Sequence, residues 1–423
     1  MMLRCQRLVE QFPRIFSCCA SKASLQKIGC RSCIPVPPME SLLEPDLVHK
    51  QNKTMDALRQ YLKDKRATLV LGAGISIPAN MPDWGRLVSQ MSGYAFQYQA
   101  YCGKGVADNR RELLFHIQQD LVTNKLSILN GVNVLEAAQY IQNTLNFAVD
   151  AQSGHEVLKE IISAIIENSE SPKAFLDRWG KEHPGQDPKS GDPVILRNIA
   201  ASNTLSAVAY LLQAKNGFRR AMTYNYDTLV QEYLISIFAV PHGEVVTHSE
   251  GWTEATAKDS IEIFHLHGCI PRKVNQAQYP AFPAESLNIV LSEDSYYDTE
   301  RYAAYNWQNS VQSFYLNRDH CIFIGFSADD YNFRRILRQL GDQKLGRPAH
   351  YLILTTDQLI RDTYESICRS HLYGKMNAVT LDQSTRVLLN QELRMKETYW
   401  LRYGFIPIWV TIQDIPNLLL SLV

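Results

Sequence analysis

The sequence lacks any excess of charge of one sign, since Lys plus Arg and Asp plus Glu each number 43. No net field therefore attracts nucleic acid or an acidic membrane surface, and neither is expected as a partner. Apolar runs long enough to span a membrane are also missing, and the closing stretch "LLLSLV" is far too short for this. The nine cysteines are scattered thinly through 423 residues, which argues against a disulfide framework and favours a reducing, cytoplasmic location.

What is present is the composition of a soluble globular protein, with 45% hydrophobic and 20% charged residues. The length suffices for one large domain or two ordinary ones. The first 38 residues differ from the rest, because they hold six basic residues against one acid and five of the nine cysteines. We interpret residues 1–38 as a poorly ordered extension, with Met39 as the true start. A transit peptide and a metal-binding knuckle at Cys30-x-x-Cys33 are the alternatives.

From Thr54 onward, short apolar segments alternate with segments of helical periodicity. The stretch "ATLVLG" is typical of a buried strand, and similar strands occur in "RRAM", "IEIF", "CIFI", "HYLILTT" and "FIPIWV". This alternation predicts an α/β fold, with a Rossmann-like parallel sheet covered by helices on both faces. Between about residues 95 and 216 the helical period continues almost without strand signals, which predicts a large inserted helical subdomain within a domain spanning 39–423.

Four short motifs lie where predicted strands end, and open α/β sheets bind their ligands at such ends. They are Gly72-Ala73-Gly74-Ile75-Ser76, Thr223-Tyr224-Asn225-Tyr226-Asp227, His265-Leu266-His267-Gly268 and Gly325-Phe326-Ser327. The two glycines of the first motif allow a pyrophosphate to approach the backbone closely. Taken singly, each motif also has an ordinary structural explanation, since Asn suits a strand-to-loop corner and a His beside Gly is more often structural than catalytic.

The first motif is not the fingerprint of a nicotinamide-dependent dehydrogenase. That fingerprint needs a third glycine, where the chain has Ile77, and an acid about twenty residues further on, where it has Ser92. The chain also enters a loop that holds Pro78 and Pro82 instead of starting a helix at once. Hydride transfer is therefore disfavoured.

Together and in this order, the four motifs resemble the sirtuin superfamily, and more closely its zinc-free, sirtuin-like branch of bacterial antiphage defence. The resemblance extends from Ala67 to Trp409 and includes "MPDW" at 81–84, "LSEDSYYD" at 291–298 and "YGFIPIWV" at 403–410. In that family the segment after Gly-Ala-Gly is a loop that folds over the nicotinamide half of NAD. The resemblance thus explains why no helix follows immediately.

Missing cysteines indicate the branch. Protein-deacylating sirtuins hold a structural zinc with two Cys-x-x-Cys pairs after the catalytic histidine, whereas only the widely separated Cys269, Cys321 and Cys368 follow it here. No zinc module and no bound metal are therefore expected. Tyr224 is a second departure, because relatives often have Thr or Gln at this place. We expect it to alter the packing and to leave the chemistry unchanged.

The resemblance implies roles for individual residues. Asn225 would orient the ribose hydroxyls or the attacking water, and His267 would accept a proton, a task that suits histidine near neutral pH. Asp227 would hold Asn225 or the ribose, with helix capping as an equal alternative. His265 is not expected to be the base, because the family pattern has the base directly before the glycine. The remaining NAD-binding residues would be Gly72, Ala73, Gly74 and Ser76 at the phosphates, Asp83 at the nicotinamide amide, and Gly325 and Ser327 at the adenosine side.

The activity that the resemblance implies is NAD glycohydrolysis, which yields nicotinamide and ADP-ribose and drains cellular NAD during phage infection. Such an activity needs restraint, which we expect from homo-oligomer assembly or from a partner such as a hexameric ring ATPase or an Argonaute-like protein. The alternatives are a scaffold that binds NAD or ADP-ribose without turnover, and a sirtuin-type protein deacylase or ADP-ribosyltransferase. The missing zinc cysteines disfavour the deacylase.

Overall fold

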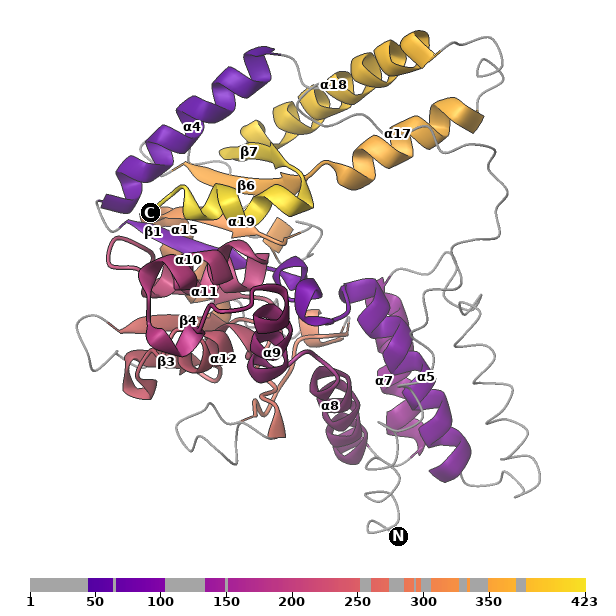
Figure 1. The fold of residues 1–423 in the computed structure, drawn as a ribbon. Helices are drawn as coiled ribbons and strands as arrows, with labels where there is room; N and C mark the ends of the chain where they lie inside the picture. The colour runs from indigo at the N-terminus through magenta and orange to yellow at the C-terminus, as the bar shows by residue number, and fades with distance from the viewer. Residues whose placement is uncertain are drawn as a thin grey trace.

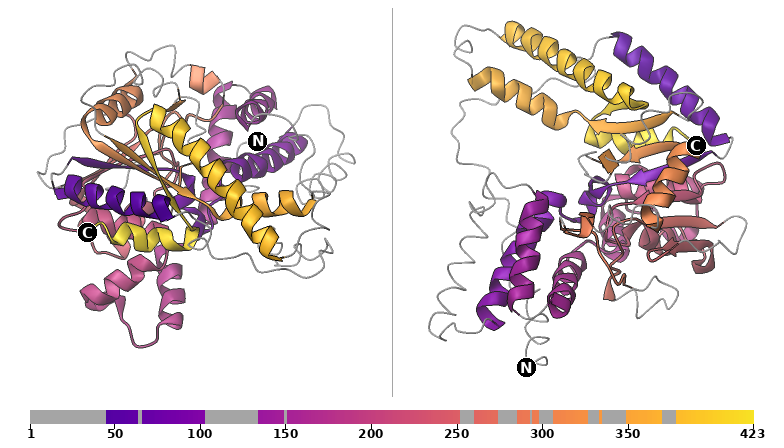
Figure 2. Two further views of the ribbon diagram at one scale, coloured as in Figure 1. Left: turned by 90° about the horizontal axis from the view of Figure 1, so that it is seen from above. Right: turned by 180° about the vertical axis from the view of Figure 1, so that it is seen from behind.

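The computed structural model describes residues 45–63, 66–102, 134–148, 151–251, 260–273, 285–292, 294–297, 306–326, 333–334, 349–369 and 378–423. The predictions for the extension at 1–38, for a start at Met39 and for Ser327 lie outside these residues. Within them, the chain forms one α/β unit with a group of helices at its side (Figures 1 and 2).

The core of the unit is a seven-stranded sheet in the order β3-β4-β2-β1-β5-β6-β7. All neighbouring strands pair in parallel, which confirms the predicted sheet. Its strands are β1 (Ala67–Leu71), β2 (Arg220–Thr223), β3 (Val245–His248), β4 (Ile261–His265), β5 (His320–Ile324), β6 (His350–Thr355) and β7 (Phe405–Val410). Pro407 cannot donate a backbone hydrogen bond, and it lies in an edge strand, where that loss is tolerated.

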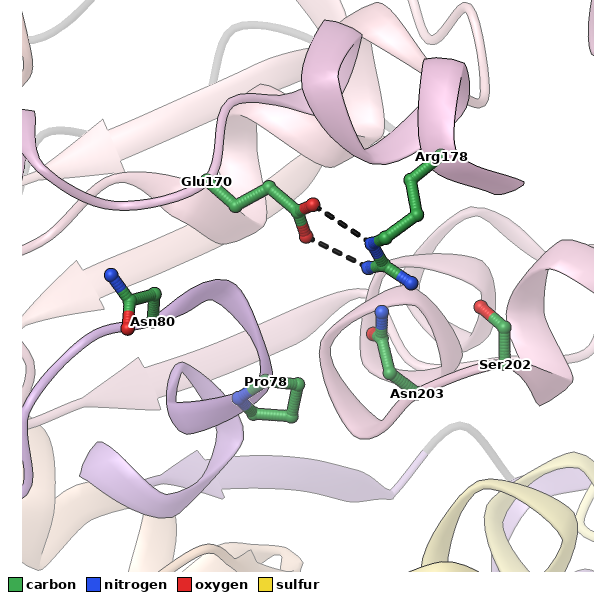
Figure 3. A pocket seen from close by; sticks show the side chains of 6 residues that line it. All are labelled: Pro78, Asn80, Glu170, Arg178, Ser202 and Asn203. Atoms are coloured by element: carbon green, nitrogen blue, oxygen red, sulfur yellow. Dashed lines mark hydrogen bonds and ion pairs between the residues drawn. The ribbon is translucent and has the colours of Figure 1, made fainter. Parts of the chain in front are cut away.

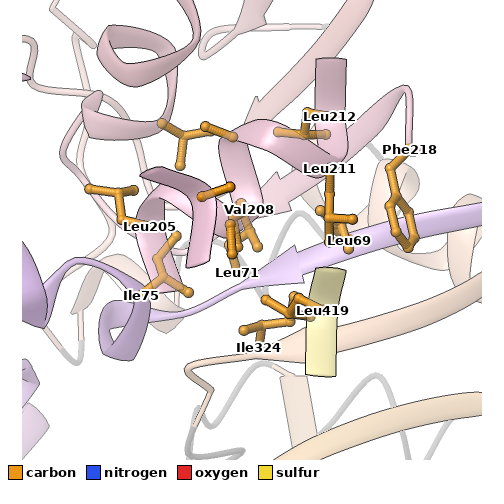
Figure 4. Packing of buried hydrophobic residues seen from close by; sticks show 14 of the residues in the cluster. Leu69, Leu71, Ile75, Leu205, Val208, Leu211, Leu212, Phe218, Ile324 and Leu419 are labelled. Carbon is orange, nitrogen blue, oxygen red and sulfur yellow. The ribbon is translucent and has the colours of Figure 1, made fainter. Parts of the chain in front are cut away.

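Helices cover both faces of the sheet. Successive side chains of a strand point to opposite faces, so a strand that is apolar throughout needs cover on both. Leu69 and Leu71 of β1 pack in one cluster, and Val70 packs in the other. The first face is covered by α4 (Pro45–Lys63), α10 (Pro193–Ala201), α11 (Thr204–Gln213), α12 (Leu229–Ser236) and α19 (Ile415–Leu420), as Figure 4 shows in part. The second face is covered by α15 (Trp307–Arg318) and by Trp400 of α18 (Ala378–Arg402), and α17 (Asp357–Arg369) packs with α18 near β7.

Between β1 and β2 the described chain contains no strand, and its α-helices there are α5 (Trp84–Cys102), α7 (Val134–Ala148), α8 (Ala151–Glu167) and α9 (Pro172–Glu182), followed by α10 and α11. Helices α5, α7 and α8 pack together in a hydrophobic cluster beside the sheet (Figure 1). Helix α11, in contrast, lies on the sheet itself. Part of the range 95–216 therefore packs on the sheet. That this range forms a separate inserted subdomain stays a prediction.

Short 3-10 turns connect several of these elements: η1 (Ala73–Ile75), η2 (Ile77–Ala79), η4 (Pro188–Ser190), η5 (His242–Glu244) and η7 (Ile412–Asp414). In the described part of the chain, every helix is too short or too polar to cross a bilayer. The strand order changes direction at β1, because β2 lies on one side of it and β5 on the other. A crevice beyond the carboxyl ends of β1 and β5 is the place where such sheets bind ligands.

Candidate functional site

The first motif forms a tight turn at this switch point. The amide of Gly72 donates to the carbonyl of Ile324 at 3.0 Å, and that of Gly74 donates to the carbonyl of Gly325 at 2.9 Å. A Cβ atom on Gly72 would lie 2.4 Å from the Gly325 oxygen, and one on Gly74 would lie 2.7 Å from the Gly325 Cα. Both glycines are thus required for the close approach of two loops. A diphosphate would have to face the other side of the turn, and its contact with the glycines stays a prediction.

Asn225 joins the second motif to this turn. Its side-chain Nδ2 donates to the carbonyl of Gly72 at 3.3 Å and to the Ser76 Oγ at 3.2 Å. Its backbone amide donates to the Thr223 Oγ1 at 3.1 Å, which holds the corner after β2. Because a carbonyl can only accept, these contacts fix which end of the carboxamide carries the hydrogens. The side-chain Oδ1 makes no hydrogen bond within the described part of the chain.

Ser76 links Asn225 to Asp227. Its hydroxyl accepts from Asn225 and donates to the Asp227 carboxyl, at 3.1 Å from Oδ2 and 3.3 Å from Oδ1. Asp227 also accepts the amide of Leu229 at 3.1 Å, at the start of α12. Burial raises the pKa of Asp227, against the hydrogen bonds from Leu229 and Ser76 that lower it. Asp227 therefore accepts from the first amide of α12 and is linked to Asn225 through Ser76, while its contact with the ribose stays a prediction.

His267 lies beyond the end of the neighbouring strand. Thr223 of β2 pairs with His265 of β4, so Asn225 and His267 each follow that pair by two residues. The His267 side chain is buried, and two tyrosine rings pack nearly perpendicular to its imidazole, with centroids 4.9 Å away for Tyr224 and 5.5 Å away for Tyr296.

Tyr224 packs against one side of His267 and is fixed there by further contacts. Its ring also contacts Phe326, and its hydroxyl donates to the Gln312 Oε1 at 2.6 Å. The residue at which the chain departs from the family pattern therefore contacts the predicted base.

Asp83 has a clear local role. Its Oδ1 accepts the amide of Arg86 at 2.8 Å, which is the bond of a helix cap at the start of α5. Its predicted contact with the nicotinamide amide stays a prediction. Gly325 has φ +63°, a conformation that favours glycine, and it follows β5 directly.

A buried ion pair near the site was not predicted. Arg272 pairs through its guanidinium with both carboxyl oxygens of Glu232, and Thr228 donates to the same carboxyl at 3.2 Å. Burial raises the pKa of Glu232 to about 7, although Arg272 lowers it. Arg272 also donates to the Ser169 carbonyl at 3.3 Å, beyond the end of α8. No sequence signal reveals this pair, because Glu232 lies on the apolar, buried side of a helix.

The helical cluster of α5, α7 and α8 also contacts both loops. Tyr226, between Asn225 and Asp227, packs in that cluster with Ile270, which follows His267 by three residues. The inserted helices therefore help to fix the loops that carry the predicted catalytic residues.

A pocket of about 400 Å³ opens beside the turn η2 (Figure 3). It is lined by Pro78, Asn80, Glu170, Arg178, Ser202 and Asn203. Glu170 and Arg178 form a two-point ion pair across it, at 3.0 and 2.9 Å. None of the predicted catalytic residues lines this pocket, so its volume does not mark their site. The polar network of Asn225, Ser76 and Asp227 identifies the site better than this cavity does.

The chain is an α/β protein with a parallel sheet whose strand order reverses at β1, and the polar network of Asn225, Ser76 and Asp227 lies at the carboxyl ends of β1 and β2. Residues 219–373 match the family model described as the SIR2-like domain. A SIR2-like domain implies that the chain binds or processes NAD. The match contains the Asn225 and His267 motifs, while β1 and its glycine turn precede it. Since β1 lies between β2 and β5, the matched segment shares one sheet with residues outside it. A search of curated proteins found no match.

Proposed function

We propose that this chain is an NAD glycohydrolase that converts NAD and water to nicotinamide and ADP-ribose. The observation that supports this most is the hydrogen-bonded set of Asn225, Ser76 and Asp227 at the ends of β1 and β2. His267 follows the adjacent strand at the same offset as Asn225.

The reaction breaks the bond between the ribose C1′ and the pyridinium nitrogen of NAD. Nicotinamide leaves with the bonding electron pair and becomes neutral, so it needs no strong acid. Water forms the new bond to C1′ and gives up a proton, which His267 accepts and later releases to solvent. The transition state resembles an oxocarbenium ion, as in other glycoside hydrolyses, and positioning of the ribose and the water supplies much of the rate.

Asn225 is suited to that positioning. Both contacts of its Nδ2 are made with protein, so the Oδ1 is the end left to accept a hydrogen bond from a ribose hydroxyl or the water. Ser76 and Asp227 keep the carboxamide in one orientation. The partly buried ring of Tyr224 and the buried ring of Tyr296 pack against His267 and limit the access of solvent to it.

Chromatography of NAD incubated with the purified protein tests the proposal. We expect nicotinamide release by the wild type and a loss of about 100-fold or more in Asn225→Ala and His267→Ala. His242→Ala is a matched control, because His242 also precedes a glycine but lies in the turn η5, away from the site. Tight NAD binding without turnover would instead favour the scaffold, and equal activity of all four proteins would exclude these catalytic roles.

On the resemblance alone, we extend the proposal to depletion of NAD in the cytoplasm during phage infection. Restraint of the activity would then come from a homo-oligomer or from a partner subunit such as a hexameric ring ATPase or an Argonaute-like protein. Repeating the assay with the product of the neighbouring gene tests this. A change in turnover on mixing supports a partner, whereas an unchanged rate favours control within the chain.

A further inference from the structure

His265 is a buried polar side chain with no part in the chemistry proposed above. It is the last residue of β4, its exposed fraction is 0%, and its two ring nitrogens both have partners. Nδ1 lies 3.0 Å from the backbone carbonyl of Asn225, and Nε2 lies 2.8 Å from the Nε2 of Gln231 in α12. The ring therefore connects the helix to the predicted catalytic asparagine.

These partners determine the tautomer. The carbonyl of Asn225 can only accept a hydrogen bond, so Nδ1 must carry the ring proton. In a neutral imidazole, Nε2 is then an acceptor, and Gln231 must present its amide hydrogens to it. Burial lowers the pKa of His265 to about 4, so the ring is neutral near neutral pH.

The backbone amide, the side-chain nitrogen and the backbone carbonyl of Asn225 each make a hydrogen bond to a different part of the protein. The amide is held by Thr223, the side-chain nitrogen by the glycine turn and Ser76, and the carbonyl by His265. Gln231 also donates to the Thr247 Oγ1 at 3.3 Å, which extends the chain of hydrogen bonds to β3. Without His265, the peptide after Asn225 would lose its only hydrogen bond from the β4 side among the described residues.

We propose that His265 is a positioning residue, which as the Nδ1–H tautomer holds the Asn225 carbonyl and so aims the Asn225 carboxamide at the ribose. The inference rests on the proposed NAD glycohydrolase activity. It predicts that His265 acts on the rate of the chemical step, because misplacement of a reacting group by about 1 Å can cost about 100-fold.

Two substitutions separate positioning from mere packing. In His265→Asn, the amide nitrogen takes the place of Nδ1 and can still donate to Asn225. In His265→Gln, the amide reaches the place of Nε2. The hydrogen bond with Gln231 can then still form, whereas the hydrogen bond to the Asn225 carbonyl is lost. We expect His265→Gln to lower kcat by about 100-fold with little change in KM. We expect His265→Asn to retain kcat to within about tenfold of the wild type.

A role in packing alone predicts the opposite order, since Gln is closer to His in volume. A kcat for His265→Gln that equals or exceeds that of His265→Asn overturns the inference. Thr247→Val is the matched control, because it removes the far end of the same chain of hydrogen bonds and leaves the Asn225 bond intact. Its kcat is expected to stay close to that of the wild type.

Nitrogen NMR of ¹⁵N-histidine-labelled wild type at neutral pH gives a readout that needs no activity. The His265 signals should report a proton on Nδ1, and a proton on Nε2 would overturn the inference even if both variants fail to fold. A wild type that releases no nicotinamide would overturn the proposed function instead. In that case the affinity of the two variants for NAD replaces kcat, with His265→Gln expected to bind more weakly than His265→Asn.

Discussion

The two ends of the sheet carry buried carboxyl groups in opposite electrostatic situations. At the amino ends of the strands, Asp319 accepts hydrogen bonds from Arg318 at 2.7 Å, Arg220 at 2.8 Å and Thr68 at 2.7 Å. At the carboxyl ends, Asp227 accepts hydrogen bonds from neutral groups, which include the Ser76 hydroxyl and the Leu229 amide, and the charge of Arg272 is the last of the causes that lower its pKa. Burial opposes ionisation at both ends, yet the pKa of Asp319 is lowered by its partners and that of Asp227 is raised.

We interpret the difference as that between a structural cluster and the proposed functional one. Arg220 also pairs with Glu262 at 3.3 Å and lies over the Tyr315 ring, so the amino-end cluster ties α15 to three strands. The carboxyl-end network holds its carboxyl at an energetic cost, and such perturbed groups concentrate at functional sites. We therefore expect substitutions at one end to change stability and those at the other end to change activity.

The largest effect is expected for Asp227→Asn. The change removes a carboxyl that is costly to ionise in this buried place and weakens the hold on Ser76 and Asn225. Nicotinamide release should fall by about 100-fold, while the midpoint of thermal unfolding stays the same or rises. Paired rate and melting measurements check this. A marked loss of stability with full activity would reverse the comparison.

Asp319→Asn should show the complementary behaviour. The substitution leaves two arginines without their shared carboxylate and should lower the free energy of unfolding by about 2 kcal/mol. Turnover per folded molecule should match the wild type, because no predicted site residue contacts Asp319 among the described residues. Denaturant unfolding and the NAD assay provide the two numbers. Lost turnover in a stable Asp319→Asn protein would contradict a purely structural role.

The pH dependence of stability should also differ between the two ends. The pKa of Asp319 is lowered on folding, so its contribution is present above the unfolded value and is lost as the pH falls through the folded value. The pKa of Asp227 is raised, so folding is favoured at low pH and penalised as the pH rises through the folded value. Asp319→Asn should flatten the acid side of the stability curve. Asp227→Asn should flatten the part of the stability curve that lies toward neutral pH. Equal stability curves for the two variants would contradict the opposite pKa shifts of Asp319 and Asp227.

The smallest effect is expected for Tyr224→Phe. This variant keeps the ring against His267 and removes only the hydroxyl that donates to Gln312. Stability should fall by about 1 kcal/mol, and kcat should change little. Tyr224→Ala removes the ring as well, and its kcat should be clearly lower than that of Tyr224→Phe. Equal kcat values for the two would show that the ring does not support His267.

The sequence allowed the parallel sheet and the ends of its strands to be predicted, because short apolar runs and motif positions carry that information. Asn225 and Ser76 were predicted from separate motifs, and the structure joins them by a hydrogen bond. The sequence could not show which atoms fill the space beside Gly72, and these belong to Gly325, which lies more than 250 residues later. Long-range packing of this kind leaves no periodic signal.

Buried polar pairs were the second gap. Gln231 and Glu232 are adjacent in an apolar helix, and their partners are His265 at the end of strand β4 and Arg272 in the loop after it. Sequence periodicity marks apolar faces, whereas the pairing of buried polar groups depends on how elements pack. The sequence motif could show that His265 is not the predicted base, because Leu266 and not glycine follows it. Its contact with the Asn225 carbonyl could be found only in the structure.

A crystal structure of the wild-type protein with bound ADP-ribose would show whether Asn225 and His267 converge on one ribose. We expect the diphosphate beside the Gly72–Ser76 turn, and the terminal ribose within hydrogen-bond distance of both Asn225 and His267. A ligand bound elsewhere, or a ribose that reaches only one of these two side chains, would contradict this expectation.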